Sequence, residues 1–194
     1  MKSIEKDTIT EIIINKSRFI SILCNIDNTN QVKDKIAFYK KKYKDATHYC
    51  TAYIIDSYTK CDDNGEPSGT AGMPILNVLK NSELNHILCI VVRYFGGIKL
   101  GAGGLVRAYS KSASEVIKKA PIIELTNGYY IEITFNYDDI KTIDNLLKDL
   151  EVEKKFDEKI IYSFKISEEN FNKIENILIN KTKITKKESV LTKA

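Results

Sequence analysis

Glycine is distributed very unevenly along this chain. Eight of the nine glycines in its 194 residues fall between Gly65 and Gly104. Arginine follows the same trend, because two of the three arginines, Arg93 and Arg107, lie in or beside this stretch while the other 27 basic residues are lysines. Glycine permits left-handed backbone and the close approach of other atoms, so we expect the backbone or a ligand to need it there. This stretch is therefore the first candidate for a functional site.

The centre of the stretch reads as a strand, a glycine loop and a helix in succession. Residues 87–95 are almost entirely apolar, which predicts a strand in the middle of a sheet. Residues 96–104 contain five glycines and predict a loop. Residues 105–120 repeat apolar side chains at three- and four-residue steps, which predicts a helix with Val106 on its buried face and with Pro121 at its end.

The start of this helix has the features of an anion site. Nothing between Phe95 and Leu105 has a side-chain oxygen to cap the first N–H groups, and bare N–H groups beside glycines are suited to an anion. A cation at Arg107 opposes the helix dipole unless an anion is bound. The alternative is that the glycines only permit tight strand–helix packing beside a solvated basic face. The predicted anion- or RNA-binding residues are Arg93, Tyr94, Gly96, Gly97, Lys99, Gly101, Gly103, Gly104, Arg107 and Lys111.

An acidic loop precedes the glycine loop and holds Asp62, Asp63 and Glu66. These carboxylates could pair with the basic side chains of the glycine stretch, form a solvated turn, or serve metal binding or acid–base chemistry. Their spacing does not match an EF-hand, so no metal site is assigned. His48 reads as a packing or capping histidine, with catalysis as the alternative. No nucleophile, base and orienting residue can be assembled from the spacing, so no catalytic residue is assigned.

Several function classes lack their motifs. Neither a Walker A loop nor a G-x-G-x-x-G motif is present, so no nucleotide cofactor is expected. The four cysteines form no C-x-x-C pair and no zinc spacing with the two histidines, and read as buried thiols. The longest apolar run, residues 87–92, is far shorter than the ~20 residues of a membrane span, and no signal segment is evident. We expect a cytoplasmic protein without a cofactor, a metal or a membrane partner.

The remaining pattern predicts an α+β protein with two domains, residues 1–125 and 126–194. The first domain carries 18 basic and 13 acidic side chains, so the positive net charge of +4 belongs to it. Its other expected elements are strands at 9–14, 18–26 and 51–56, helices at 28–43 and 74–79, and a loop at 58–70. The second domain is expected to contain a strand at 129–137, a helix at 138–150, a hairpin of 151–157 and 159–167, a helix at 168–180 and a strand at 184–191. This β-α-β-β-α-β order is that of a ferredoxin-like domain.

Two runs of residues resemble the YigZ/IMPACT family. They are residues 62–74, DDNGEPSGTAGMP, and residues 91–109, VVRYFGGIKLGAGGLVRAY, and His48 ahead of Cys50 also fits. Asn64 is an extra residue in the family's usual Asp-Asp-Gly-Glu stretch. The resemblance implies a bacterial two-domain member. Its first domain would share the fold of elongation factor G domain IV and of a small-subunit ribosomal protein, and its second would resemble elongation factor G domain V.

The resemblance also bears on function, because family members are associated with translation control. Together with the residues, it predicts a translation-associated regulatory protein that binds RNA or the ribosome through the glycine loop and the basic helix start. A second hypothesis is an enzyme acting on a phosphorylated small molecule or nucleotide, with the acidic loop or His48 as the reactive groups. A third is a protein-interaction module in which the bound anion is a carboxylate of a partner protein, with a protein regulator of translation as the candidate partner. We favour binding over catalysis.

Overall fold

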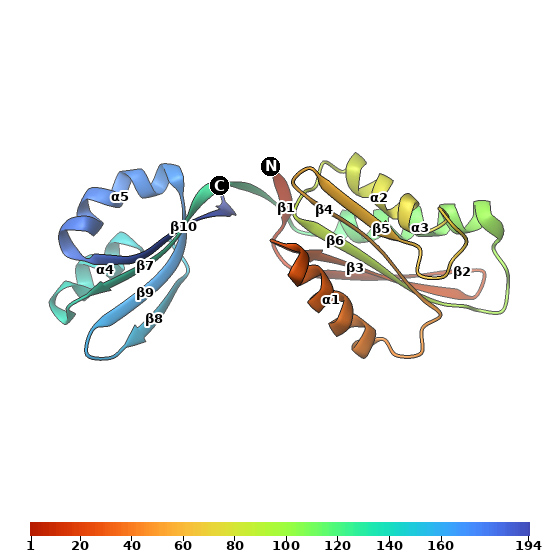
Figure 1. The fold of residues 1–194 in the computed structure, drawn as a ribbon, viewed down its shortest axis with the longest axis horizontal. Coiled ribbons are helices and arrows are strands. Elements are labelled where there is room, and N and C mark those ends of the chain that lie inside the picture. The colour runs from red at the N-terminus through yellow and green to blue at the C-terminus, as the bar shows by residue number, and fades with distance from the viewer. The chain divides into compact units, whose positions relative to one another are not determined.

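The structure is a computed structural model that describes residues 1–194. Its contacts divide the chain into two compact units, Met1–Ile123 and Glu124–Ala194. Each unit combines helices with its own antiparallel sheet, so the protein is a mixed α and β protein (Figure 1). None of its helices is both long enough and apolar enough to span a membrane.

The first unit is built on a five-stranded sheet with the order β2-β3-β6-β4-β5, in which every neighbouring pair is antiparallel. Strand β6 lies in the middle, as its continuous apolar run predicts, and seven of its eight residues are buried. The bounds of the strands are β2 Thr8–Ile14, β3 Ser17–Asn25, β4 His48–Ile55, β5 Tyr58–Asp62 and β6 Ile87–Tyr94.

Strand β5 corrects the prediction of a loop over residues 58–70. It pairs with β4 from Ile55↔Tyr58 to Thr51↔Asp62, and the two strands join through a two-residue turn in which Asp56 has a φ of 52°. The strand lies at the edge of the sheet and is only half-buried, so its sequence carries few apolar residues to reveal it.

Three longer helices cover the two faces of this sheet (Figure 1). The helix α1, Thr29–Lys42, packs on one face, and the Asn28 side chain caps it by accepting from the N–H groups of Asn30 and Gln31. The helices α2, Gly72–Asn81, and α3, Gly101–Lys119, pack on the other face. A short strand β1, Lys2–Ile4, pairs with β7, Ile122–Phe135, and is not part of this sheet. The core therefore has two layers, one on each side of β6.

The helix α3 differs from its prediction in two respects. It begins at Gly101, inside the expected loop, so three of the loop glycines lie in its first turn. Its buried face contains Leu105 and Tyr109, whereas Val106 remains 38% exposed. In the structure, Leu105, Tyr109, Ser112 and Val116 form a buried stripe at steps of three and four residues.

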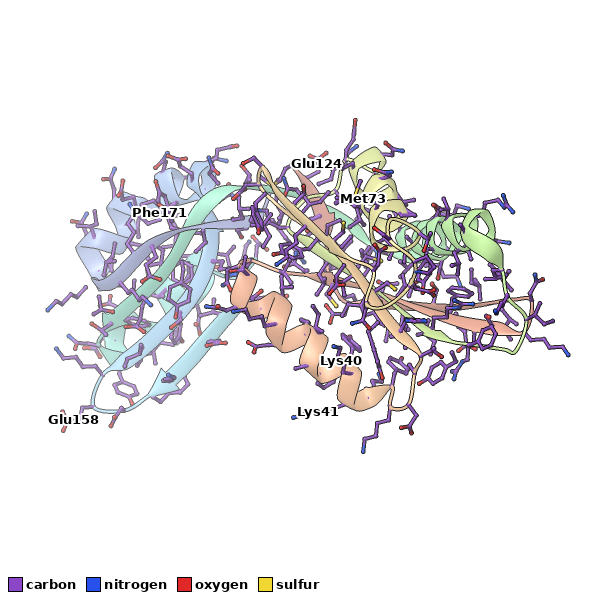
Figure 2. All side chains as sticks on the ribbon, turned by 45° about the vertical axis from the view of Figure 1, so that its right-hand side comes forward. Lys40, Lys41, Met73, Glu124, Glu158 and Phe171 are labelled. Carbon is purple, nitrogen blue, oxygen red and sulfur yellow. The ribbon has the colours of Figure 1, made fainter.

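The strands of the second unit follow the order β10-β7-β9-β8 with every neighbouring pair antiparallel, and β1 also joins this sheet beside β7. The helix α5, Glu168–Lys181, packs on this sheet through Phe171, which is fully buried and is labelled in Figure 2. The Ser167 hydroxyl caps α5 by accepting from the Asn170 N–H at 3.3 Å. The elements are β7 Ile122–Phe135, the 3₁₀ turn η1 Tyr137–Asp139, α4 Ile140–Leu146, β8 Val152–Phe156, β9 Ile160–Ser167, α5 Glu168–Lys181 and β10 Lys183–Lys193.

Two boundaries in this unit depart from prediction. Strand β7 begins at Ile122 rather than near residue 129, because residues 125–128 pair with the end of β10. Gly128 therefore lies within a strand, where a Cβ atom would come within 2.3 Å of the Ile166 carbonyl oxygen. The glycine permits strands to approach there and does not form a turn. The helix expected over residues 138–150 ends already at Leu146.

Candidate anion-binding site

The glycine loop between β6 and α3 packs against the turn that joins β2 to β3. The Gly96 N–H donates to the Ser17 hydroxyl at 3.3 Å, and a Cβ atom on Gly96 would come within 2.0 Å of the Lys16 carbonyl carbon and oxygen. Only glycine permits this approach of two backbones. Gly97 and Gly101 have φ values of 85° and 69°, so the loop also needs glycine for its left-handed turns.

The α3 helix starts without a cap. Its N-cap position is Leu100, no side chain accepts a hydrogen bond from its first N–H groups, and no acidic residue lies in its first turn. Gly101, Ala102 and Gly103 are exposed, so their backbone faces solvent. The positive end of the helix dipole and its unpaired N–H groups therefore lie open at the surface.

Exposed cations surround this helix start. Lys16 lies on the β2–β3 turn and Lys99 on the loop, while Arg107 and Lys111 lie on the second and third turns of α3. All four are exposed. None of the four forms an ion pair or a side-chain hydrogen bond within the protein. Arg107 and Lys111 also line an open pocket of about 310 Å³. The other lining residues of this pocket are Ile14, Asn15, Leu100, Gly104 and Ala108.

Arg93 occupies a different place from these cations. Its side chain is only 6% exposed, and its Nη1 donates to Glu66 Oε1 at 2.5 Å. Nη2 donates to the Ser17 hydroxyl at 3.3 Å, and the guanidinium lies over the rings of Phe19 and Phe95. Arg93 is therefore buried away from the exposed helix start, where the sequence had predicted it to contact an anion. In the structure its guanidinium binds Glu66 and holds the acidic loop in place.

Tyr94 also makes contacts within the protein. Its hydroxyl donates to the Lys44 carbonyl oxygen at 3.0 Å, and the Arg18 guanidinium lies 5.5 Å from the ring centre. One face of the ring is thus occupied by a cation. The prediction that Tyr94 stacks on a base gains no support from these contacts.

The acidic loop uses its three carboxylates in three different ways. Glu66 pairs with Arg93, as one of the alternatives proposed, and Asp62 accepts from the Asn64 N–H at 2.7 Å within the turn. Asp63 accepts from the N–H groups of Gly69, Ala71 and Gly72 at 2.8–3.0 Å and so caps the start of α2. No group of three or more His, Cys, Asp and Glu side chains is arranged to hold a metal ion.

These contacts change the chemistry of the loop. Burial raises the pKa of Asp63, but the backbone donors of Gly69, Gly72 and Ala71 outweigh burial and leave the pKa below its ordinary value. A carboxylate that accepts from three N–H groups stabilises the turn into α2. The role of Asp63 is therefore structural, since its oxygens are already hydrogen-bonded to the backbone.

His48 holds the same loop from the start of β4. Its Nδ1 lies 2.9 Å from the Asn64 carbonyl oxygen, and its Nε2 lies 3.8 Å from Glu66 Oε2. A Cβ atom on Gly65 would lie 3.5 Å from the imidazole, so the loop backbone packs on the ring. Nearby, the Cys50 thiol donates to the Asp63 carbonyl oxygen at 3.0 Å, and burial raises the pKa of Cys50 to about 12. The thiol is therefore protonated at neutral pH and unsuited to nucleophilic attack.

Sequence reasoning missed the contribution of the β2–β3 turn to this site. Asn15 and Lys16 both have left-handed φ values, 46° and 63°, and Ile14 and Asn15 line the pocket. A two-residue link with asparagine at its first position is a recognisable hairpin signal. Its position beside the glycine loop follows only from the sheet, because β3 pairs with β6.

Comparison with known proteins identifies the family. The Impact N-terminal domain profile matches residues 15–117. YvyE, an IMPACT family member from Bacillus subtilis (strain 168), is 44% identical over 142 residues, which cover 72% of this chain and 65% of YvyE. YigZ, an IMPACT family member from Escherichia coli (strain K12), is 37% identical over 124 residues, which cover 58% of this chain and 61% of YigZ. The matched region thus spans less than two thirds of either relative's length.

The fold is also similar to that of a solved structure. A crystal structure described as that of a hypothetical protein superposes with a TM-score of 0.64 at 26% identity, over 94% of this chain and 95% of that chain. The profile match contains both the acidic loop and the glycine loop, the two segments that shape the site described above. From the profile match and the identity to YvyE, the chain belongs to the IMPACT family.

Proposed function

We propose that this protein is a translation-associated regulator that binds RNA, at the ribosome, through the start of α3. The observation that carries the proposal is the uncapped helix start with four unpaired cations around it. Helix N-termini bind phosphate through free N–H groups and a favourable dipole, and lysine and arginine supply the long-range attraction. A polymer of phosphates matches both features.

The position of the Arg107 guanidinium adds to this proposal. Arg107 lies on the second turn of α3, and its Nη1 reaches back to the first turn, where a Cβ atom on Gly103 would lie 3.6 Å from it. The positive end of the helix dipole and this cation therefore lie close together, with neither Asp nor Glu in the first turn to offset them. A phosphate bound at this position would offset them, because it attracts both the guanidinium and the N–H groups.

The role in translation rests on the family resemblance. We propose further that the first unit shares the fold of elongation factor G domain IV and that the second is a ferredoxin-like domain similar to domain V. The strand order β10-β7-β9-β8 supports the second assignment, since the βαββαβ chain order in a ferredoxin-like sheet gives this arrangement. Association with translation control is the reason to test ribosomal RNA first.

A salt series tests the proposal directly. We expect single-stranded RNA and ribosomes to bind the full chain more weakly as salt rises, with a log–log slope of about −0.7 per phosphate contact on single strands. Arg107→Ala should weaken binding and make the slope less steep by about 0.7. The matched control is Lys41→Ala, because Lys41 is an exposed lysine on α1, on the opposite face of the sheet (Figure 2). Binding that ignores both salt and Arg107→Ala would overturn the proposal.

The alternative functions give different results in companion experiments. An enzyme acting on phosphorylated metabolites would turn over or be stabilised by a member of a nucleotide and phosphoester panel with Mg²⁺. An interaction module would retain a protein partner after nuclease treatment. The acidic loop favours neither alternative, since Asp62, Asp63 and Glu66 each already bond to other groups of the chain.

A further inference from the structure

We propose that the pocket beside the α3 start receives one unstacked base of a single-stranded RNA, while Arg107 and Lys111 hold the adjoining phosphates. This inference rests on the proposed RNA-binding function, and it specifies which kind of RNA the site prefers. The pocket lies between the end of β2 and the first three turns of α3 and has a volume of about 310 Å³. That volume is at the small end of the ~300–1,000 Å³ typical of ligand sites.

The walls of the pocket suit the faces of a base. Ile14, Leu100 and Ala108 supply apolar surface, and Ile14 and Leu100 are each only partly buried. Enzymes and binding proteins that take a base out of a stack hold its faces between aromatic or apolar side chains. A phosphate alone would gain nothing from these apolar walls, so they indicate a ligand with an apolar part.

Charge and polarity narrow the choice of ligand. Arg107 and Lys111 lie one helical turn apart, and no acidic residue lines the pocket. The Asn15 amide offers both a donor and an acceptor, and the edge of a base presents both in return. A nucleotide therefore uses the apolar walls, the amide and the two cations together, with its base between the walls and its phosphates at Arg107 and Lys111.

The position of Asn15 is fixed by its surroundings. It has a φ of 46° in a two-residue turn, followed by Lys16 at 63° and by the buried Ser17, whose hydroxyl accepts from the Gly96 N–H. The Asn15 side chain forms no hydrogen bond within the protein. The turn is thus held against the glycine loop while the amide remains free to bind a ligand.

One consequence follows for the type of RNA. Bases within a duplex are stacked and paired, so their faces cannot enter a pocket of this kind. The basic surface alone would accept single and double strands alike through their phosphates. The pocket should therefore make the protein prefer loops, bulges or free ends.

The test compares two oligomers that have equal charge. One is a 12-nucleotide uridine RNA, and the other is a ribose-phosphate chain of the same length with no bases. We expect the wild-type chain to bind the abasic oligomer about tenfold more weakly at fixed salt, as loss of one well-packed base would predict. Leu100→Ala should weaken binding of the uridine oligomer to a similar extent and should not further weaken binding of the abasic one. Arg107→Ala should weaken binding of both and lower the salt slope.

A second variant guards against a folding defect, because Leu100 packs partly against the core. Asn15→Gly removes the amide and retains the left-handed backbone, so it should lose the preference for uridine RNA without loss of thermal stability. Equal binding of the two oligomers by the wild-type chain, with Arg107→Ala still weakening both, would overturn the pocket proposal and leave RNA binding intact. Failure of both oligomers to bind at low salt would overturn the RNA function itself.

Discussion

Arg93 and Glu66 form an ion pair in which both side chains are enclosed by the protein. The distance from Nη1 to Oε1 is 2.5 Å, and the side chains are 6% and 4% exposed. The same carboxylate oxygen accepts from the Tyr109 hydroxyl at 2.7 Å. One carboxylate thus connects the acidic loop, the central strand β6 and the helix α3. The pair therefore holds the acidic loop against β6 and α3, although Glu66 and Arg93 lie 27 residues apart in sequence.

Removal of one partner should be costly. Arg93→Met leaves the Glu66 carboxylate buried without a counter-charge, so we expect the free energy of unfolding to fall by about 3–5 kcal/mol. Glu66→Gln combined with Arg93→Met should recover part of that loss, because no net charge remains buried. Urea unfolding of the two single variants and the double variant measures the coupling.

The exposed pair between Arg18 and Glu11 provides the control for this cycle. Its side chains are 46% and 43% exposed, although the geometry is equally close at 2.7 Å. Arg18→Met should therefore cost less than about 1 kcal/mol. A comparable loss at both pairs would show that burial does not determine the effect.

Asp63 should make stability depend on acid pH. Its pKa is lowered in the folded protein, so its stabilising effect is present above its unfolded pKa and is lost as the pH falls through the folded value. Asp63→Asn should reduce the free energy of unfolding by about 1–2 kcal/mol at pH 7. The difference from the wild type should shrink from about pH 4 downward. Urea titrations between pH 3 and pH 7 would reveal this trend, and a constant difference across the range would contradict it.

Gly103 offers a way to separate stability from binding. It lies in the first turn of α3 without a left-handed φ, and a Cβ atom there would meet only Arg107 Nη1, at 3.6 Å. Gly103→Ala should therefore raise the free energy of unfolding by about 0.5–1 kcal/mol. It should also weaken RNA binding, because the methyl group would stand between a phosphate and the N–H groups. Thermal unfolding and filter binding on the same preparation check both expectations.

Gly96 is the contrasting case for that variant. A Cβ atom on Gly96 would collide with the backbone of Lys16. Because backbone atoms cannot rotate aside as a side chain can, Gly96→Ala would push the loop away from the β2–β3 turn. We expect Gly96→Ala to lower the unfolding temperature by several degrees. If Gly103→Ala also destabilised the protein, its glycine would have a structural role that the available space does not indicate.

The thiols should react with alkylating reagents in a definite order. Burial raises the pKa of Cys50 and of Cys89 to about 12, and it raises the pKa of Cys24 as well. Cys61 is the one cysteine that is not fully buried. Mass spectrometry after maleimide labelling at pH 8 should find Cys61 modified first and the other three only after unfolding. Rapid labelling of Cys50 in the native protein would contradict the enclosed cluster around Glu66.

Much of the fold could be predicted from local signals. The apolar run of β6 indicated a central strand, because its residues are adjacent in the chain. The polar residues Asn28 and Thr29 were both candidates for the cap of α1, and the structure shows Asn28 in that role. The edge strand β5 was missed because it is too polar to show an apolar pattern. The early start of α3 was missed because glycines are poor helix formers, and here the tertiary structure overrides propensity.

The site was predictable to a similar degree. An uncapped helix start can be predicted from the absence of capping side chains over the nine residues 96–104. The burial of Arg93 could not be read in this way, since its partner Glu66 lies 27 residues away. Asp63 looked like a free carboxylate because its three N–H donors become available only when the chain turns into α2. Charged residues were therefore easy to find and hard to assign to surface or interior.

The open start of α3 has a consequence for how occupancy could be measured. A ligand that supplies acceptors to residues 101–104 would complete the helix, and by mass action would stabilise the folded state by about 2.7 kcal/mol at a concentration one hundred times its Kd. Hydrogen exchange at those four amides would slow in proportion to the fraction of protein bound. Hydrogen exchange at the uncapped start of α3 would thus measure how much of the protein has ligand bound, without a label and without an assay for activity.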